Sequence, residues 1–448
     1  MKWFRTIHSL CCGMLHIHYN DIWGKSDPDR FREDTGYYIK GGFDVEALEE
    51  FSTEDEGYDI VIFADQLAKS QCKPLSEIIP LMPPSPKLVD PLPFLDTYHG
   101  WKKEHGKIDF TDMLVMYDDE GEPGDVDVVI VDEAQDLSSL QWKIVDRFSK
   151  DAETMYIAGD DDQSIYKFLG ADEFGFLDYE ADEDIVLTHS YRCPAVIGER
   201  ATKVIKKIER RKDKTVTWQE KDGEVKVHNM DEMFLPWKDW AAGEASVMVL
   251  TRHRRQMYEV RKMLNKMKIP HTINGSSMAT SHMGKMIRVY LELVKKTMAF
   301  RPSVVGQMLE AIGDKDQART VRDLGVKNRT LTLTREDIII PYTDSWPMLF
   351  SKRKWELAQI NALRQQINEF GLEIIGPLPN IDIGTYHGSK GREAEHVVLF
   401  TDCYAATWAE QQINPDSETR LAYVGLTRSK KTVTIIPPRT LTYLQALV

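Results

Sequence analysis

The sequence has few cysteines, no long apolar run and no low-complexity tract, and each absence excludes a class of protein. Its five cysteines form neither a C-x-x-C pair nor a Cys/His zinc spacing, and an odd, scattered set is typical of reduced thiols inside a cell. No run approaches the roughly 20 apolar residues that a membrane-spanning helix needs. Arg5 and His8 interrupt the apolar start, which we interpret as mature sequence rather than a signal peptide. These features predict a cytoplasmic protein.

An overall excess of basic side chains is also absent. The chain has 57 Lys+Arg and 71 Asp+Glu in 448 residues, so its net charge is −14. Residues 1–200 hold 18 basic and 43 acidic side chains, whereas the rest holds 39 and 28. The total alone does not indicate a nucleic-acid binder, but the split predicts that the two halves meet different partners. The length is sufficient for two to four domains with buried cores.

Strand patterns indicate an α/β fold. Residues 126–132 and 154–160 are nearly continuous apolar runs, each followed by a helix-like segment, which predicts parallel strands buried on both faces. Residues 276–375 instead show helical periodicity. Further strand patterns occur at 224–230, 245–252, 382–387, 395–402 and 432–437. We therefore predict two α/β domains, the second of them interrupted by a helical insertion.

Two local predictions concern the first domain. Residues from about 25 to 100 are acidic and rich in turn formers, which predicts a small insertion or lid-like segment. Residues 101–116 are expected to form one helix.

The strongest local motif is VVIVDEAQD, in which a predicted strand delivers Asp132 and Glu133 to its carboxyl end. Two adjacent carboxylates there suit phosphoryl transfer, because one can hold Mg²⁺ and the other can orient an attacking water. The alternative is a solvated strand end without chemistry.

Two further motifs follow along the chain. In AGDDDQSIYKF, Gln163 could reach a phosphate, and Tyr166 and Phe168 could stack on single-stranded bases. In LTHSYRCP, Arg192 could neutralise phosphate charge and Tyr191 could stack on a purine. The first segment alone could equally be a turn with two core aromatic residues. For the second segment alone, a surface arginine and a packed tyrosine is the favoured alternative.

The last two motifs lie in the second predicted domain. TYHGSKGRE offers Thr385, His387 and Lys390 for phosphate binding, and its Glu393 could accept hydrogen bonds from a ribose. ETRLAYVGLTRSKK carries Arg428 near the end of an apolar helix, where an isolated arginine could also be a helix cap.

Together and in this order, these segments resemble the UvrD/Rep-like family of superfamily 1 DNA helicases. DEAQD resembles its Walker B motif, and FRTIHSLC and IDFTDML resemble its motifs Ib and Ic. GDDDQSIY, HSYRCP, TYHGSKGRE and ETRLAYVGLTRS resemble its motifs III, IV, V and VI. Phe168 stands where the family usually has Trp, and Leu169 where it usually has Arg, which puts one DNA or nucleotide contact in doubt.

The resemblance implies two RecA-like parallel-sheet domains with ATP in the cleft between them. The first would be residues 1–195, incomplete and with the insertion at about 25–100. The second would be 196–275 and 376–448, split by the helical insertion at 276–375.

The family's site residues transfer to matching positions. Asp132 would ligate Mg²⁺, Glu133 would activate water and Gln163 would sense the γ-phosphate of ATP. Arg192 and Arg428 would be arginine fingers, Tyr191 would stack on adenine and Glu393 would hold the ribose. The resemblance implies 3′→5′ movement on DNA, with the DNA-side candidates Thr6, His8, Tyr166, Phe168, Thr385, His387 and Lys390.

Three motifs of the family are missing: the Q motif, the Walker A loop and motif Ia, and no G-x-x-x-x-G-K-[ST] sequence occurs. Family members place this Walker A loop, with the Q motif and motif Ia, ahead of motif Ib, which here begins at residue 4. Without it, Asp132 would supply half of a metal site, and the first sheet would have unpaired strand edges. We hypothesise that the chain is the C-terminal portion of a split or truncated helicase and that an upstream polypeptide carries Walker A.

A second hypothesis is a non-catalytic, DNA-binding or complex-forming remnant of a helicase. The retention of Glu133, Arg192 and Arg428 argues against it, because a binding module would not need all three. The pathway stays open among DNA repair, DNA replication and phage metabolism.

Overall fold

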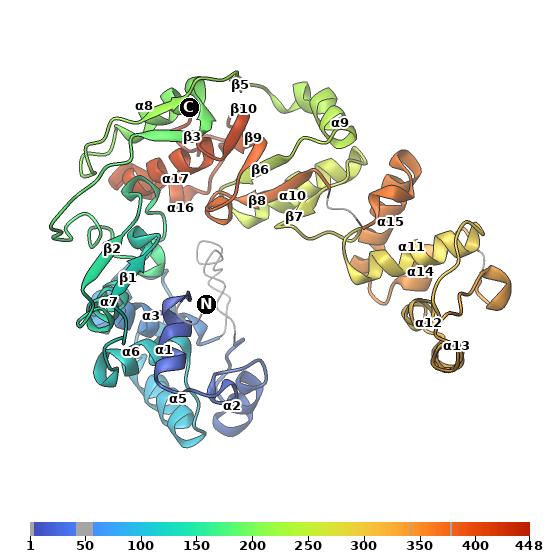
Figure 1. The fold of residues 1–448 in the computed structure, drawn as a ribbon, viewed down its shortest axis with the longest axis horizontal. Helices are drawn as coiled ribbons and strands as arrows, with labels where there is room; N and C mark the ends of the chain where they lie inside the picture. Colours follow the sequence, from blue (N-terminus) through green and yellow to red (C-terminus); the bar gives the residue numbers. More distant parts are fainter. Residues whose placement is uncertain (1–3, 42–56, 342, 377–378) are drawn as a thin grey trace. The chain divides into compact units, whose positions relative to one another are not determined.

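The computed structural model describes residues 4–41, 57–341, 343–376 and 379–448 and has an α/β fold with parallel sheets (Figure 1). This confirms the predicted fold class. The chain forms two compact units: unit 1 comprises Met1–Ser190, Glu199–Thr217 and Tyr404–Val424, and unit 2 comprises Tyr191–Gly198, Trp218–Cys403 and Gly425–Val448. Within the described ranges, no helix combines the length and apolar character that membrane crossing requires.

Unit 1 contains a two-stranded parallel sheet of β1 (Val128–Val131) and β2 (Thr154–Ile157). On one face, Val129 and Val131 join a buried core. On the other face, Val128, Ile130 and Tyr156 are 49%, 72% and 61% exposed. The prediction of buried strands was therefore wrong for this face of the sheet.

Helices form the rest of unit 1. Residues 101–116 do not form the predicted single helix, because α5 ends at Glu104 and α6 begins at Phe110. Gly106 takes a positive φ of 62° between them, and the Asp109 carboxylate caps α6 by accepting from the Asp112 backbone N–H. The helices are α1 (Ile7–Met14), α2 (Asp27–Thr35), α3 (Asp59–Ser70), α4 (Leu75–Ile78), α5 (Leu92–Glu104), α6 (Phe110–Glu120), α7 (Ser139–Phe148), α16 (Ala405–Ile413) and most of α17 (Asp416–Leu426).

The segment at about 25–100 is a helical module rather than a set of turns. Helices α2, α3, α4 and α5 enclose a separate hydrophobic core that contains Phe31, Phe94, Tyr98 and Trp101. Their rings meet mostly edge to face, with the centroid of Phe31 5.8 Å from those of both Tyr98 and Trp101. Part of the predicted insertion, residues 42–56, lies outside the described residues.

Unit 2 is built on a six-stranded parallel sheet in the order β5-β10-β9-β6-β8-β7. The central strand β6 is buried along its whole length, as expected for a parallel strand covered on both faces. The five strand patterns predicted from the sequence are confirmed. The strands are β5 (Glu224–Val227), β6 (Val247–Thr251), β7 (Thr272–Ile273), β8 (Ile381–Thr385), β9 (Ala394–Phe400) and β10 (Ser429–Ile436).

The stretch between β7 and β8 is helical, as its periodicity predicted (Figure 1), and it has its own hydrophobic core. Its helices are α11 (His282–Val294), α12 (Pro302–Ala311), α13 (Lys315–Lys327), α14 (Trp346–Phe350) and α15 (Lys354–Phe370), while α9 (Phe234–Ala242) and α10 (Arg254–Lys266) belong to the α/β part. The chain passes between the units at β3 (His189–Pro194), α8 (Ala195–Ile205) and β4 (Thr217–Gln219).

Candidate functional site

The first group of candidate residues lies where β1 and β2 of unit 1 end. Asp132 and Glu133 directly follow β1, and the segment with Asp160 and Gln163 follows β2. Because the strands are parallel, their carboxyl ends share one edge, the usual ligand edge of α/β sheets. The structure thus brings the predicted metal ligand Asp132 and the predicted catalytic residues Glu133 and Gln163 to the same edge.

A chain of hydrogen bonds connects these two strand ends. Gln135 donates from Nε2 to the Glu133 carboxylate at 2.6 Å, and its Oε1 accepts from the Asp160 backbone N–H at 2.9 Å. Gln163 then donates from Nε2 to the Asp160 carboxylate at 2.7 Å. The side chains expected to orient water and to sense phosphate therefore belong to one polar network.

Gln135 is the residue of this network that our sequence reasoning missed. It is only 2% exposed, and both ends of its amide are engaged. A Cβ at Gly159 would lie 2.6 Å from its Oε1, so the glycine leaves room for the amide. Glu133 has a left-handed backbone with φ of 53°, which is costly for a non-glycine residue and is typical of functional sites.

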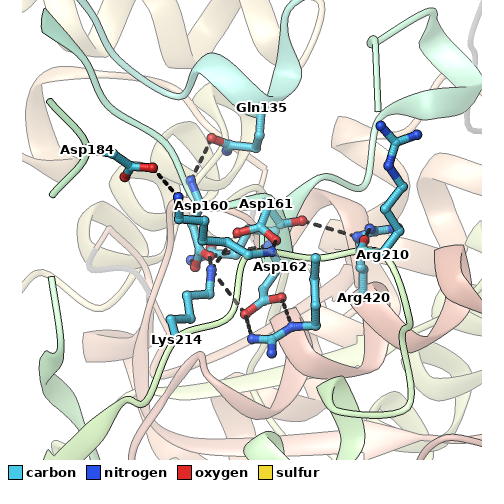
Figure 2. A network of polar contacts seen from close by, with 11 residues as sticks. Gln135, Asp160, Asp161, Asp162, Asp184, Arg210, Lys214 and Arg420 are labelled. Carbon is cyan, nitrogen blue, oxygen red and sulfur yellow. Dashed lines mark hydrogen bonds and ion pairs between the residues drawn. The ribbon is translucent and has the colours of Figure 1, made fainter. Parts of the chain in front are cut away.

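Asp160, Asp161 and Asp162 form an acidic cluster beside this network, which Figure 2 shows with its basic partners. Carboxylate oxygens of the three residues lie within 4.8 Å of one another, a spacing that could hold a metal ion. In the structure, basic side chains from residues 210–214 of the same unit approach them. The cluster therefore has internal counter-ions.

Lys214 is the central counter-ion. Its ammonium lies 2.5 Å from Asp160, 2.6 Å from Asp161 and 3.1 Å from Asp162. Arg211 binds Asp162 through two hydrogen bonds, of 2.7 and 2.6 Å. Burial raises the pKa of Asp160, but the charge of Lys214 and hydrogen bonds from Lys214 and Gln163 outweigh it, so the pKa is lowered overall. Asp160 is therefore ionised at neutral pH.

Arg420, on α17, joins the same loop to the motif near the end of the chain (Figure 2). Its guanidinium is buried and donates to the Asp161 carbonyl at 3.1 Å and to the Glu173 carboxylate at 2.8 Å. The sequence placed this arginine in a motif but gave it no role, because its partners lie about 250 residues away.

The second group of candidate residues lies in unit 2. Arg192 donates from Nε to the Glu393 carboxylate at 3.0 Å, and Lys430 also pairs with Glu393. Hydrogen bonds from Lys430 and Arg192 lower the pKa of Glu393, so this carboxylate is ionised. The Arg428 guanidinium is buried and reaches the Arg392 carbonyl at 3.5 Å. Arg192, Glu393 and Arg428 are therefore neighbours, although they are far apart in sequence.

The remaining candidates of unit 2 differ in accessibility. Tyr191 is 78% exposed. Thr385 and His387 are buried, and the Thr385 hydroxyl accepts from the Gly388 backbone N–H at 3.0 Å. Lys390, at the end of the short 3₁₀ turn His387–Ser389, is half-buried.

The DNA-side candidates of unit 1 lie in two places. Thr6 is the exposed N-cap of α1 and accepts from the Ser9 backbone N–H, and the His8 ring meets Phe110 edge-on at 5.7 Å. Tyr166 and Phe168 are half-buried with ring centroids 6.3 Å apart. In the structure, Thr6 therefore caps a helix, and the rings of His8, Tyr166 and Phe168 make local packing contacts.

The residues at the β1 edge fit part of a Mg²⁺ site. The Asp132 side chain is exposed, and its Oδ1 accepts only the Glu133 backbone N–H among the described contacts. Mg²⁺ commonly takes one or two protein carboxylates and completes its octahedron with waters and substrate phosphates. Asp132 could supply such a carboxylate.

Models of known families match two stretches of the chain. Residues 1–184 match the family model of the UvrD/REP helicase N-terminal domain, and residues 344–439 match that of the UvrD-like helicase C-terminal domain.

Individual relatives match parts of the chain. It is 29% identical over 247 residues to YjcD of Bacillus subtilis (strain 168), whose name assigns it to the ATP-dependent DNA helicases, across 52% of this chain and 31% of that protein. It is 36% identical over 101 residues to the ATP-dependent DNA helicase PcrA of the same strain, across 22% of this chain and 14% of the relative. A PcrA of Staphylococcus aureus (strain Mu50 / ATCC 700699) is 35% identical over 107 residues, across 23% and 14%. The chain thus spans less than a third of each relative's length.

Proposed function

The chain belongs to the UvrD/Rep-like family of superfamily 1 helicases, and we propose that it works as an ATP-dependent DNA helicase or translocase that moves 3′→5′. The observation that carries this proposal is the continuous hydrogen-bond chain from Glu133 through Gln135 and Asp160 to Gln163. A water-activating carboxylate and a phosphate-sensing amide need such a shared, rigid support, because small errors of position are costly in phosphoryl transfer.

Each residue of the first group has a proposed task. Glu133 accepts hydrogen bonds from the attacking water and orients it, and Gln163 contacts the γ-phosphate. Asp132 would hold Mg²⁺, which when bound neutralises charge on the ATP phosphates.

The second group supplies positive charge and nucleoside contacts. Arg192 and Arg428 stabilise negative charge that develops on the γ-phosphate, Tyr191 stacks on adenine, and Glu393 accepts from the ribose. The Arg192–Glu393 pair holds the guanidinium in a defined orientation until ATP binds.

The proposed enzyme also needs a phosphate-binding loop, and the sheet of unit 1 suggests how one is added. Val128, Ile130 and Tyr156 form an exposed apolar face, whereas parallel sheets in α/β proteins are normally covered on both faces. We propose that a polypeptide segment that carries a strand, Walker A and a helix covers this face and pairs with the sheet. The sequence G-x-x-x-x-G-K-[ST] is absent from the 448 residues, so this chain would be the C-terminal portion of a split or truncated enzyme.

The decisive experiment begins with the coding DNA immediately upstream of Met1. If a strand–Walker A–helix frame is present there, its product is added to the purified chain, and DNA-stimulated ATP hydrolysis is measured. We expect turnover only in the mixture, and Glu133→Gln should lower kcat by about 10²-fold or more while single-stranded DNA binding is retained. Turnover by the chain alone at a typical helicase rate, or full turnover by Glu133→Gln, would refute the assigned roles. Partial duplexes with either a 3′ or a 5′ tail test the direction of movement.

The exposed sheet face also favours a second candidate function, that of a non-catalytic DNA-binding or complex-forming subunit. Such a subunit would bind DNA but would not hydrolyse ATP with any Walker A segment. The absence of a Walker A frame upstream would favour this candidate.

A further inference from the structure

A cavity of about 460 Å³ lies in unit 2, away from the residues assigned to ATP hydrolysis. Its walls come from α10, the loop between β7 and α11, the last residue of α14, and α15. Its volume falls within the range of small-ligand sites, and pockets often form between structural lobes, as here between the α/β part and the helical insertion.

Direct contacts hold the walls together. Gln366 of α15 is buried and donates from Nε2 to the Ile269 carbonyl at 3.0 Å, just beyond α10. On the same helix, Glu369 pairs with Lys268 at 3.3 Å. Because α15 also contributes Ile360 and Leu363 to the core of the insertion, the cavity is bounded by packed elements rather than by loose loops.

One side of the cavity is apolar and adaptable. Met278, Met283 and Phe350 line it together with Ile360 and Leu363. Methionine and phenylalanine side chains make favourable contacts with flat, polarisable rings.

Among the polar residues of the lining, Arg261 and His271 come from different parts of the chain. Arg261 of α10 lines the cavity and is half-buried, and across the described ranges its guanidinium has neither a hydrogen bond nor an ion pair. His271 is 7% exposed, and its Nδ1 lies 2.8 Å from the Ile269 carbonyl oxygen. Since a carbonyl only accepts, Nδ1 carries the hydrogen, and Nε2 presents a lone pair.

His271 stays neutral at physiological pH. Burial is the largest effect and, with a smaller contribution from the charge of Arg261, lowers the pKa of its imidazole to about 4. The hydrogen bond to the Ile269 carbonyl, the second-largest effect, and the charge of Asp382 raise this pKa but do not outweigh burial.

The cavity therefore offers a cation, a hydrogen-bond acceptor and apolar side chains. Its lining also includes Glu356, whose carboxylate accepts from the backbone N–H groups of Lys352 and Arg353. A ligand that satisfies all three has an anionic group, an N–H donor and a flat ring.

We propose that this cavity binds one nucleotide unit, with its phosphate on Arg261 and its base between His271 and the methionine-lined wall. The outer surface of α10 supports this choice over an uncharged metabolite, because Lys262 and Lys266 are exposed there and attract phosphates. The inference goes beyond the proposed ATP hydrolysis, since none of these residues belongs to either catalytic group. The nucleotide unit can be a free mononucleotide or part of a single strand.

The test uses the full chain without ATP. Binding of a mixture of the four deoxynucleoside 5′-monophosphates is measured by calorimetry for wild type, Arg261→Ala and His271→Leu. The matched control is Arg255→Ala, which removes an exposed arginine of the same helix that does not line the cavity. We expect Arg261→Ala to weaken binding at least about tenfold and Arg255→Ala less than about twofold, with all melting temperatures within a few degrees.

A second measurement distinguishes a free mononucleotide from a nucleotide within a single strand as the ligand. A short oligothymidylate with one 5-iododeoxyuridine is photo-crosslinked to the chain, and the attached peptide is identified by mass spectrometry. Crosslinks at Tyr258, Met278 or Met283 that monophosphates compete away indicate a strand that inserts a base, whereas monophosphate binding without such crosslinks indicates a free nucleotide.

Three results would overturn the proposal: no monophosphate binding and no crosslink at these residues, equal losses for Arg261→Ala and Arg255→Ala, or preferential binding of an acidic peptide. Because no assay here needs hydrolysis, failure of the proposed ATPase would leave this test intact.

Discussion

The Lys214 ammonium lies 2.5 Å from the Asp160 carboxylate, which in turn accepts from Gln163 at 2.7 Å. A lysine 54 residues along the chain thus fixes the acidic residue that orients the proposed phosphate sensor. Only 11% of the Lys214 side chain is exposed, against 31% of the Asp160 side chain, so the ammonium is the better shielded partner from water and salt.

Replacing Lys214 by Met should destabilise unit 1 strongly. The substitution leaves Asp161 and Asp162 buried next to Asp160 without their central counter-ion, and loss of one partner of a buried ion pair typically costs about 3–5 kcal/mol. Urea unfolding of the purified chain measures the loss. Lys212→Met is the matched control, because Lys212 pairs with Asp184 on the surface and should cost less than about 1 kcal/mol. Equal effects of the two variants would contradict the central position of Lys214.

The same pair predicts how stability depends on pH. The folded-state pKa of Asp160 is depressed, so its contribution is present above the unfolded value of about 4 and is lost as pH falls through the folded pKa. The pKa of Lys214 is raised by the three aspartates despite its burial, so its contribution is lost only as pH rises above the ordinary lysine value of about 10.4. The stability difference between wild type and Lys214→Met should therefore be constant from about pH 5 to 9 and shrink below pH 4. A difference that changes near pH 6.5 would point to a histidine instead.

Gln135→Leu tests whether the hydrogen bonds of Gln135 support catalysis as well as stability. Leucine fills similar space but leaves the Glu133 carboxylate without its 2.6 Å donor and the Asp160 N–H without an acceptor, at a cost of about 1–3 kcal/mol. In the reconstituted enzyme, we expect a fall in kcat with little change in the KM for ATP, because Glu133 and Gln163 lose their shared support. The control is Gln141→Leu, which removes a capping side chain of α7 instead. A similar kcat for both variants would remove Gln135 from the mechanism.

The sequence predicted what depends on local pattern and missed what depends on distant partners. The apolar run at 245–252 was enough to predict β6, because continuous β-branched and aliphatic residues fit a buried parallel strand. The break between α5 and α6 was missed, because Gly106 and the capping Asp109 interrupt an otherwise helical pattern. The order of the motifs along the chain identified Glu133 and Gln163 as candidate site residues. The contacts of Lys214 and Arg420 could not be predicted. No pattern in the sequence around a basic residue indicates a carboxylate or carbonyl partner that lies far along the chain.

The exposed face of the β1–β2 sheet gives the last prediction. Ile130→Lys adds a charge to a side chain that is 72% exposed, so the chain alone should keep its stability to within about 0.5 kcal/mol. If a Walker A segment covers this face, the same charge would be buried in the complex, and Ile130→Lys should prevent both association and ATP hydrolysis. Size-exclusion chromatography of the mixed polypeptides measures association. Val129→Ala, on the buried face, is the opposite control, because it should destabilise the chain by roughly 1–3 kcal/mol and leave association intact at low temperature. Wild-type association by Ile130→Lys would show that the segment binds elsewhere.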